Sequence, residues 1–362
     1  MNLLFLTHQG GGAGSTYSIH YLASGLADRG HKVYVGCPKD SLLYRLVSQS
    51  RATAIAMRFR SKTDRSNIRH IRDIVKSRHI QLINAQSGKD RYTSILANWL
   101  YALHCPVVHT RRQVPASTGI FLQNWFYTHG TKKIVAVSYG VRDALAQLGI
   151  PVSHITVIHN GTPTEKYKLE HPEKIIQLKT AFNLKPDNIV LGCVSRKKQQ
   201  EQLLQALKHL TRPVTVFLIG VTERPEYKQI TDQYSLPHTI HYLGHIEQKQ
   251  ALYYYKLFDI KILPSVTEGV SQAILEAMAL NVPVIATRAA GNIDIIQDGV
   301  NGLLFEPGDS EGLALSIEKL VRDRKLYTKL SRNGRHTATD TFSIQETIRK
   351  YEQFFDNLIK SS

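Results

Sequence analysis

Short apolar runs alternate with amphipathic stretches along most of the chain. In the first half, strands are predicted by "NLLFL", "KVYVG", "IQLINA", "PVVHT", "KIVAVS" and "ITVIHNG", and a helix by "YSIHYLASGLADRG". Helical segments separate most of these strands, which is typical of a parallel sheet. The first half therefore predicts one α/β domain, which we place at residues 1–165.

The alternation stops and then restarts. Residues 166–187 are polar and punctuated by prolines, so we expect an interdomain connection with a short helix. Beyond it, "NIVLGCVSR", "VTVFLIG", "HTIHYLG", "IKILPS" and "PVIATR" predict strands, and "EQLLQALKHL" predicts a helix, giving a second domain at residues 188–341. Residues 342–362 predict a final amphipathic helix that packs back toward the first domain. The expected fold class is α/β, with two Rossmann-like doubly wound domains facing a cleft.

Composition supports a globular protein. Hydrophobic residues make up 42% and charged residues 21% of the 362 positions, enough for two cores. No apolar stretch approaches a membrane span, and "MNLLFLTHQGGG" lacks a cleavage-like site, so we expect a first strand and not a signal peptide. Cys37, Cys105 and Cys193 are far apart, which fits a reducing cytosol and neither a disulfide framework nor a zinc site.

Positive charge is concentrated in the first half. The net charge is +17, and residues 1–165 carry 20 Lys and Arg against 7 Asp and Glu. Residues 166–362 carry 26 against 22, so the surplus is +13 in the first part and +4 in the second. An anionic partner is therefore expected to meet the first domain: nucleic acid, a phosphorylated substrate or an acidic membrane surface.

Two glutamates stand out in "PSVTEGVSQAILEAMA". Glu268 lies in a loop, and Glu276 lies on a helix whose apolar stripe, Val270, Ile274 and Met278, packs into the domain. A carboxylate on such a helix needs a partner, and a ribose diol offers two hydroxyl donors. The start of the helix suits an anionic group. For an isolated pair, a helix cap at Glu268 and a structural ion pair at Glu276 would be the simpler interpretation.

The pair is not isolated. With "PVIATRAAGN" and "DGVNGLLFEPGD" following in order, the chain resembles, over nearly its whole length, the retaining family-4 (group 1) glycosyltransferases of the GT-B fold. The resemblance implies transfer of a sugar from a nucleotide-sugar to an acceptor, with retention and without a metal. Asn281 stands where the family usually has glycine, and Asp294 where it usually has glutamate, so donor identity is not inferred.

The resemblance also implies donor-site roles. Glu276 would bind the nucleotide ribose, and Glu268 would lie near the donor sugar. The segment "CVSRKKQQEQLLQAL" supplies Arg196 and Lys198, which would stabilise charge on the leaving phosphate. The loop is shorter than typical, so Lys197 could replace Lys198, and a solvated basic loop is the other interpretation. The remaining donor-binding candidates follow Glu268 directly: Gly269, Val270 and Ser271.

Candidates in the first domain follow strands. The loop "GGGAGS" does not fit a dinucleotide fingerprint, since Ser15 takes the third glycine position. The resemblance places Gly11 and Gly12 near the donor and acceptor, a plain tight turn being the alternative. By strand order, His109 would contact the donor sugar, a surface-loop histidine being equally compatible. The acceptor side is expected to include Lys89, Asp90 and Arg111.

Several partners follow from these features. The sequence contains no D-x-D pair and no cluster with metal-ligand spacing, so no metal or other cofactor is expected. The expected partners are a nucleotide-sugar and a glycan or glycolipid acceptor of lipopolysaccharide or cell-surface type. Nine Lys and Arg between Arg51 and Arg78, and the aromatic stretch "TGIFLQNWFYTHGTKK", would suit an anionic membrane surface. A solvated helix face and a buried helix explain them equally well. The expected location is cytoplasmic, at the inner face of the membrane if that surface binds.

Two other functions would explain part of the sequence. A sugar-nucleotide epimerase shares the two-domain architecture but lacks the segment with two glutamates. A nucleic-acid-binding protein would explain the charge of +17. It would not explain the two carboxylates or the balanced charge of the second half, and no nucleic-acid partner is expected.

Overall fold

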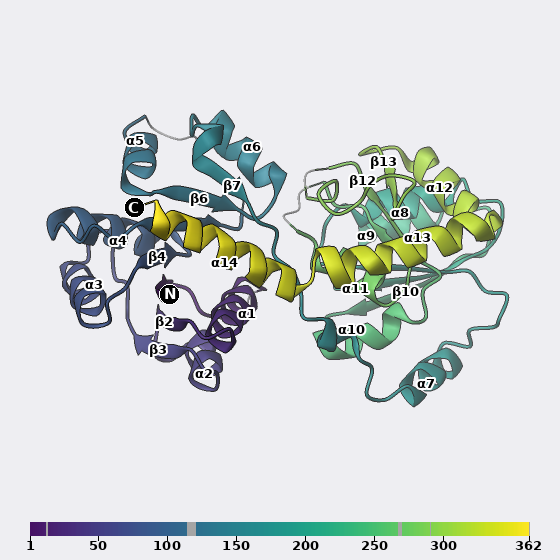
Figure 1. Ribbon diagram of the computed structural model, residues 1–362. Helices are drawn as coiled ribbons and strands as arrows, with labels where there is room; N and C mark the ends of the chain where they lie inside the picture. The colour runs from purple at the N-terminus through teal and green to yellow at the C-terminus, as the bar shows by residue number, and fades with distance from the viewer. Residues whose placement is uncertain (12–13, 114–120, 267–269, 290, 362) are drawn as a thin grey trace. The chain divides into compact units, whose positions relative to one another are not determined.

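The computed structural model describes residues 1–11, 14–113, 121–266, 270–289 and 291–361. It divides into two compact units (Figure 1). The first unit is made of Met1–Gly161 together with Ile344–Ser362, and the second of Thr162–Ser343. The C-terminal helix therefore belongs to the first unit, although the second unit separates it from the rest of that unit in sequence.

The first unit is built on a seven-stranded parallel sheet with the strand order β3-β2-β1-β4-β5-β6-β7. Its strands are β1 (Asn2–Leu6), β2 (Lys32–Cys37), β3 (Thr53–Ala56), β4 (Leu82–Ala85), β5 (Val107–Arg111), β6 (Lys133–Ala136) and β7 (Ile155–Val157). Its helices are α1 (Gly14–Asp28), α2 (Leu42–Ser48), α3 (Arg65–Ser77), α4 (Gly88–Leu100), α5 (Phe121–Gly130), α6 (Tyr139–Gln147), the 3₁₀ turn η1 (Val152–His154) and α14 (Ile344–Lys360).

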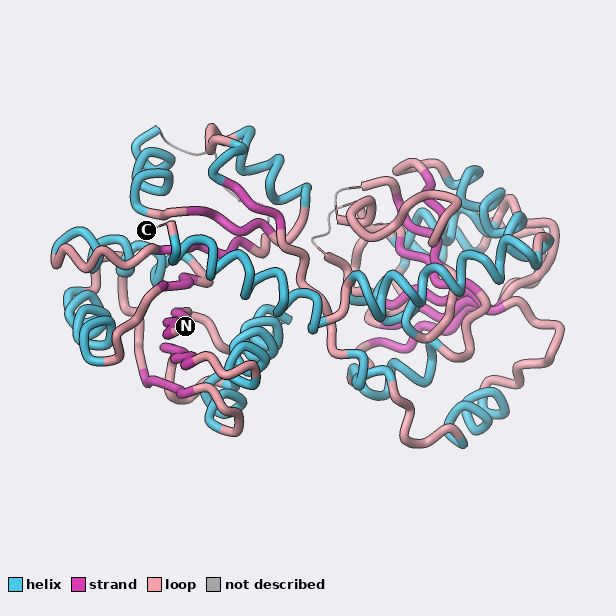
Figure 2. Tube along the Cα trace, in the orientation of Figure 1, coloured by secondary structure: helices cyan, strands magenta, loops and turns pink. Residues whose placement is uncertain are grey.

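Helices cover both faces of this sheet, which explains the continuous apolar run of β1. Leu3 and Phe5 pack into the cluster that contains α1 and α14, and Leu4 and Leu6 pack into the cluster under α3 and α4. Phe5 meets Phe355 of α14 edge to face, with 6.2 Å between the ring centroids. Figure 2 shows α14 crossing the unit next to the strands. The strand order switches between β1 and β4, the kind of position beside which ligands bind in this type of fold. The loops that follow these two strands contact each other, since the backbone of His8 donates to Ser87 and Asp90.

The second unit repeats this plan with a six-stranded parallel sheet in the order β10-β9-β8-β11-β12-β13. Its strands are β8 (Val190–Val194), β9 (Thr215–Ile219), β10 (Thr239–Gly244), β11 (Ile260–Leu263), β12 (Val284–Thr287) and β13 (Leu303–Phe305). Its helices are η2 (Thr164–Tyr167), α7 (Glu173–Ala181), α8 (Gln200–Leu207), α9 (Pro225–Thr231), α10 (Gln248–Tyr255), α11 (Gln272–Ala279), α12 (Ser310–Arg322), α13 (Arg324–His336) and the π-helical turn η3 (Thr337–Thr341).

The predicted fold class, two Rossmann-like doubly wound α/β domains, is confirmed. Each predicted strand is present, and two further strands, β3 and β13, extend the edges of the two sheets. The short helix expected in residues 166–187 is α7, and the tail helix begins at Ile344. None of the helices in the described ranges is both long and apolar enough to span a membrane.

Candidate active site

Glu276 lies on α11 with its side chain turned into the second unit. Ile274 and Met278 on the same helix are fully buried, as the apolar stripe predicts, and Glu276 itself is only 5% exposed. Its Oε1 accepts hydrogen bonds from Lys166 Nζ at 2.6 Å and from Gln248 Nε2 at 2.9 Å. Its Oε2 accepts from the Tyr255 hydroxyl at 3.1 Å. The partner that a buried carboxylate needs is thus present within the chain.

These partners come from two elements that sequence reasoning did not connect with Glu276. Lys166 lies on η2, while Gln248 and Tyr255 lie at the two ends of α10. Tyr255 is completely buried, and burial followed by the charge of Glu276 raises its pKa well above the usual value, so the phenol stays protonated and donates. Oε2 has one described donor, so one of its lone pairs is still available.

The loop between β8 and α8 carries the basic candidates. Arg196 is exposed, and its guanidinium makes no hydrogen bond or ion pair with any residue in the described ranges. Lys197 is exposed as well, and its Nζ lies 3.2 Å from the carboxylate of Glu226. Lys198 is half-buried, and its backbone N–H donates to Gln200 Oε1 at 2.7 Å. Of the three, Arg196 is therefore the cation most open to a ligand.

Gln200 holds this loop in place, a role that sequence reasoning missed. Its side chain is fully buried, and Nε2 donates to Ser195 Oγ at 3.0 Å and to the Arg196 carbonyl at 2.8 Å. The neighbouring Gln199 accepts a bond from the backbone of Val266 at 3.3 Å, which links the loop to the segment before α11. The two loops that follow β8 and β11 therefore lie together at one edge of the sheet.

The start of α11 is only partly described. Ser271 is its N-cap residue and is 5% exposed, and Val270 before it is half-buried. Glu268 and Gly269 lie outside the described residues, and so does Gly12 of the glycine loop. Among the described residues predicted for the donor site, the structure therefore places Glu276 and Ser271 on one helix. The β8–α8 loop contacts the segment just before that helix.

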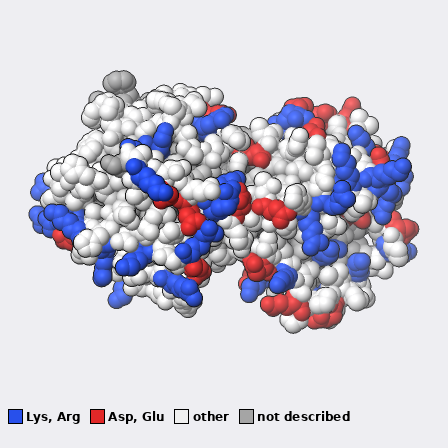
Figure 3. Space-filling view, viewed as in Figure 1, with Lys and Arg blue, Asp and Glu red and all other residues white. Residues whose placement is uncertain are grey.

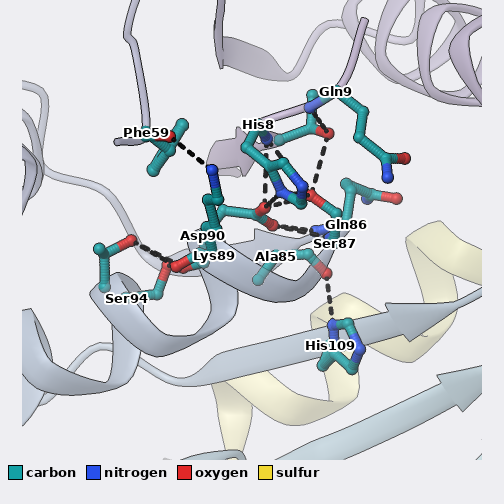
Figure 4. Close-up of polar contacts among 12 residues, drawn as sticks. His8, Gln9, Phe59, Ala85, Gln86, Ser87, Lys89, Asp90, Ser94 and His109 are labelled. Carbon is teal, nitrogen blue, oxygen red and sulfur yellow. Dashed lines mark hydrogen bonds and ion pairs between the residues drawn. The ribbon is translucent and has the colours of Figure 1, made fainter. Parts of the chain in front are cut away.

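In the first unit, Asp90 organises the loop between β4 and α4. It is completely buried, and its carboxylate accepts from the backbone N–H groups of Gln86 and Ser87 at 2.8 Å each and of His8 at 3.2 Å. His8 Nδ1 and Ser87 Oγ also contact Oδ1. Figure 4 shows these bonds converging on Asp90. The carboxylate is thus committed to a capping box that fixes the loop.

Lys89 and Gly11 lie at the same edge of the sheet. Lys89 Nζ donates to the Phe59 carbonyl at 3.4 Å, so its ammonium group lies over the loop after β3 (Figure 4). Gly11 is exposed, and its carbonyl accepts a bond from the Thr16 hydroxyl in the first turn of α1. Its neighbour Gly10 has a steric role, since a Cβ there would lie 2.7 Å from Ser41.

His109 is a buried residue of β5 and not a surface-loop histidine. It is 1% exposed, and its Nδ1 lies 3.1 Å from the Ala85 carbonyl, so Nδ1 carries the proton (Figure 4). Burial, followed by the charges of Arg91 and Arg111, lowers its pKa well below the usual range. The ring is therefore neutral at physiological pH, and Nε2, which has no partner in the described ranges, presents a lone pair. His109 can accept a hydrogen bond from a ligand but cannot donate one from Nε2.

Arg111 is half-buried, and its Nε donates to the Gln113 carbonyl at 2.9 Å. Arg91 and Arg112 were not selected from the sequence. Their charges, like that of Arg111, contribute to the lowered pKa of His109. The carboxyl edge of the first sheet thus carries a concentrated positive charge. As for metals, the described ranges hold no group of three or more His, Cys, Asp or Glu side chains arranged to bind one.

Comparison with known proteins finds two glycosyltransferase family matches. Residues 12–166 match the family "Glycosyltransferase Family 4", and residues 173–337 match "Glycosyl transferases group 1". A capsular polysaccharide biosynthesis glycosyltransferase of Staphylococcus aureus is 27% identical over 240 residues, which cover 63% of this chain and 62% of that protein. A lipopolysaccharide core biosynthesis glycosyltransferase of Rhizobium meliloti is 28% identical over 234 residues, covering 63% and 65%.

Solved structures share the fold over the whole chain. HepE of Anabaena, solved in complex with UDP, superposes with a TM-score of 0.82 at 22% identity, covering 99% of this chain and all of that one. A glycosyltransferase from Rickettsia africae gives a TM-score of 0.81 at 21% identity, covering 100% and 99%. The chain matches about three fifths of the length of the first curated relatives. The two family matches together account for nearly all of the chain and support a group 1 glycosyltransferase.

Proposed function

We propose that the protein transfers a sugar from a nucleotide-sugar donor to a glycan or glycolipid acceptor, with retention of anomeric configuration and without a metal ion. The observation that carries the proposal is the buried carboxylate of Glu276 on α11, next to a loop with an open arginine. The family matches and the relatives in capsule and lipopolysaccharide synthesis support it. These matches do not favour the epimerase or the nucleic-acid-binding alternative.

In this proposal, Glu276 receives the ribose of the donor. Oε2 has a lone pair left after the bond from Tyr255, and a ribose hydroxyl could donate to it. A second hydroxyl would share or replace the bond from Lys166 or Gln248 on Oε1. Lys166 would then balance the charge of the carboxylate, so that binding the neutral diol does not leave a buried anion unpaired.

Arg196 and Lys198 would meet the donor diphosphate. Breaking the bond between sugar and phosphate leaves growing negative charge on the leaving oxygen, and fixed cations stabilise that charge most in the transition state. The loop is held by Gln200, so these cations are positioned before the donor binds. Val270 and Ser271 precede the first turn of α11, whose free N–H groups favour an anion.

Arg196→Ala and Lys198→Ala variants are therefore expected to slow sugar transfer by roughly 10²–10³-fold, the usual loss when one group that stabilises an oxyanion is removed. Lys197→Ala is the matched control, because Lys197 already pairs with Glu226. Initial rates would be measured with UDP-, GDP- and ADP-sugars and a membrane glycolipid extract, with EDTA present, and NMR of the product would report the anomeric configuration. Loss of turnover with EDTA that magnesium restores would overturn the metal-free mechanism, and an effect confined to Lys197 would move the phosphate contact by one residue.

We further propose that the first unit docks on an anionic membrane surface. Trp99 and Leu100 at the end of α4 are 43% and 67% exposed, and Trp125 on α5 is 48% exposed. The rings of Trp99 and Trp125 lie 6.1 Å apart, so they form one aromatic patch. Exposed indole rings near cations are typical of membrane interfaces. Phe126 and Tyr127 of the same stretch pack inward, as a buried helix face would.

Basic side chains lie close to this patch. α3 packs against α4, and Lys and Arg cover the region of α3 in the view of Figure 3. In the loop before α3, Arg58, Arg60 and Lys62 are all exposed. Lys62 Nζ lies 4.8 Å from the ring centroid of Tyr92 on α4, which connects the charges to the aromatic helix.

Co-sedimentation with liposomes tests this docking. Each basic residue near an anionic bilayer contributes about 1 kcal/mol, so reversing the charges of Arg58, Arg60 and Lys62 should release most of the bound protein. Binding should require anionic lipid and fall at high salt, because the attraction is screened beyond about 8 Å at physiological ionic strength. Equal binding to neutral and anionic liposomes, or binding to neither, would contradict the proposal. Reversal of Arg324 and Lys325, on the second unit, is the control.

A further inference from the structure

Three arginines with no ion-pair partner in the described ranges lie near the carboxyl edge of the first sheet, at the start of α4 and the end of β5. Arg91 on α4 is 6% exposed, and Arg111 and Arg112, at the end of β5, are half-buried. Within the described ranges, none of the three guanidinium groups lies against a carboxylate as an ion pair. Buried charges in proteins are normally paired, because an isolated charge loses its hydration without compensation. A cluster of this kind needs an explanation.

The hydrogen bonds that the cluster does make leave several donors unused. Arg91 Nη2 donates to the Tyr127 hydroxyl, and its guanidinium carbon lies 3.5 Å from the centroid of that ring, but its Nε has no partner among the described residues. Arg112 Nη1 donates to Gln86 Oε1, but its Nε and Nη2 have no partner in the same ranges. Gln86 is 7% exposed, and its Nε2 also meets no described acceptor. Four buried N–H-bearing atoms therefore lack acceptors in the part of the chain that the structure describes.

The nearby carboxylate cannot serve them. Asp90 follows Gln86 and precedes Arg91, but its two oxygens already accept from His8, Gln86 and Ser87. The electrostatic effect of the cluster is visible on His109, whose pKa is lowered by burial first and then by Arg91, Arg111 and Arg112. Gln86 directly follows the end of β4, and His109 of the neighbouring strand β5 pairs with Ala85, the last residue of β4 (Figure 4). Both lie toward the carboxyl edge of the sheet, where ligands bind in this fold.

We propose that Arg91, Arg111, Arg112 and Gln86 form an anion subsite of the first unit that binds a phosphate or diphosphate group of the acceptor. Guanidinium groups match phosphate oxygens in charge and geometry, and several unused donors on one group are what a multivalent oxyanion can satisfy. This inference rests on the proposed function, because that function identifies the ligand as the acceptor. The observation of the unused donors does not depend on the proposed function.

A diphosphate group could come from two molecules, the acceptor and the donor, and we expect each to bind at a different place. The diphosphate of a lipid-linked acceptor would meet these arginines, whereas the diphosphate of the donor is expected at Arg196 in the second unit. Arginine Nε–H resonances report each group directly, so NMR titrations of the full-length, ¹⁵N-labelled protein can distinguish them without any measurement of activity. The probes are inorganic pyrophosphate, farnesyl diphosphate and UDP, and the signals are assigned with Arg91→Lys and Arg112→Lys variants.

We expect pyrophosphate and farnesyl diphosphate to shift the Nε–H signals of Arg91 and Arg112 saturably. The apparent affinity for UDP at these signals should be lower by about tenfold or more. Arg112→Gln should weaken both probes by about tenfold or more, the usual cost of losing bonds to a charged group, and Arg45→Gln, an exposed arginine on α2, should not. No shift with any probe, or a shift with UDP alone, would overturn the subsite. A shift with farnesyl diphosphate in a protein that binds no nucleotide-sugar would keep the subsite and overturn the proposed function.

Discussion

A Glu276→Gln variant is expected to bind the donor nucleotide about ten- to a hundredfold more weakly than the wild type. Replacing a charged acceptor removes roughly 1.5–3 kcal/mol from hydrogen bonds to the ribose hydroxyls. Glutamine has the same length and keeps one carbonyl oxygen for the Tyr255 phenol, so the fold should survive. Isothermal titration calorimetry with the nucleotide diphosphate that gives the largest thermal shift measures the change.

Two further variants make this result specific. Glu226→Gln removes an exposed carboxylate from the same unit, one that pairs with Lys197, and should change the affinity by less than about twofold, as is usual for an exposed ion pair. Lys166→Met removes the ion-pair partner of Glu276 but leaves the carboxylate. If Glu276 served only that ion pair, both Lys166→Met and Glu276→Gln would lower stability and neither would change nucleotide affinity. That outcome would remove the ribose role.

Asp90→Ala is expected to lower the transition temperature of the protein by at least about 6–12 °C. The substitution leaves the backbone N–H groups of Gln86, Ser87 and His8 without their acceptor. Each buried donor left unpaired costs about 1–3 kcal/mol, so a loss of about 3 kcal/mol is the lower bound. For a unit of this size, 1 kcal/mol corresponds to about 2–4 °C. Differential scanning calorimetry measures the transition.

The matched control for this prediction is Asp73→Ala. Asp73 lies on α3 in the same unit, its side chain is 59% exposed, and its described partner is Arg72. Such a surface pair contributes at most about 1 kcal/mol, so its removal should shift the transition by no more than a few degrees. An Asp90→Ala protein that melts with the wild type would show that the capping box does not stabilise the β4–α4 loop.

Most of the strands, such as β1 and β9, could be predicted because they are buried and read as continuous apolar runs. β3 was not predicted because Thr53–Ala56 is a four-residue edge strand inside a basic stretch, and its burial is incomplete. β13 is only three residues long, Leu303–Phe305, and has no room to show a pattern. Edge strands need less apolar sequence, since one side of each pairs with no neighbour.

The residues of the candidate site also differ in how far the sequence could predict them. Glu276 and Arg196 could be found because they lie in a continuous motif. Lys166 and Arg91 could not, because their roles arise from contacts with residues far away in sequence, Glu276 and Tyr127. The role of Asp90 could have been predicted from a local pattern. Ser87 lies three residues before it, which is the spacing of a capping box, and this pattern favours a structural role in the loop over a role in acceptor binding.

The central claim is that the second unit binds the donor nucleotide at α11 and the β8–α8 loop. Hydrogen–deuterium exchange tests it most directly, because it maps the site without knowledge of the acceptor. With saturating nucleotide diphosphate, the predicted result is slower exchange in peptides covering residues 194–204 and 270–280, and loss of this protection in Glu276→Gln at the same nucleotide concentration. Protection confined to residues 1–161 would contradict the claim, as would bound nucleotide that leaves both segments of the second unit unprotected.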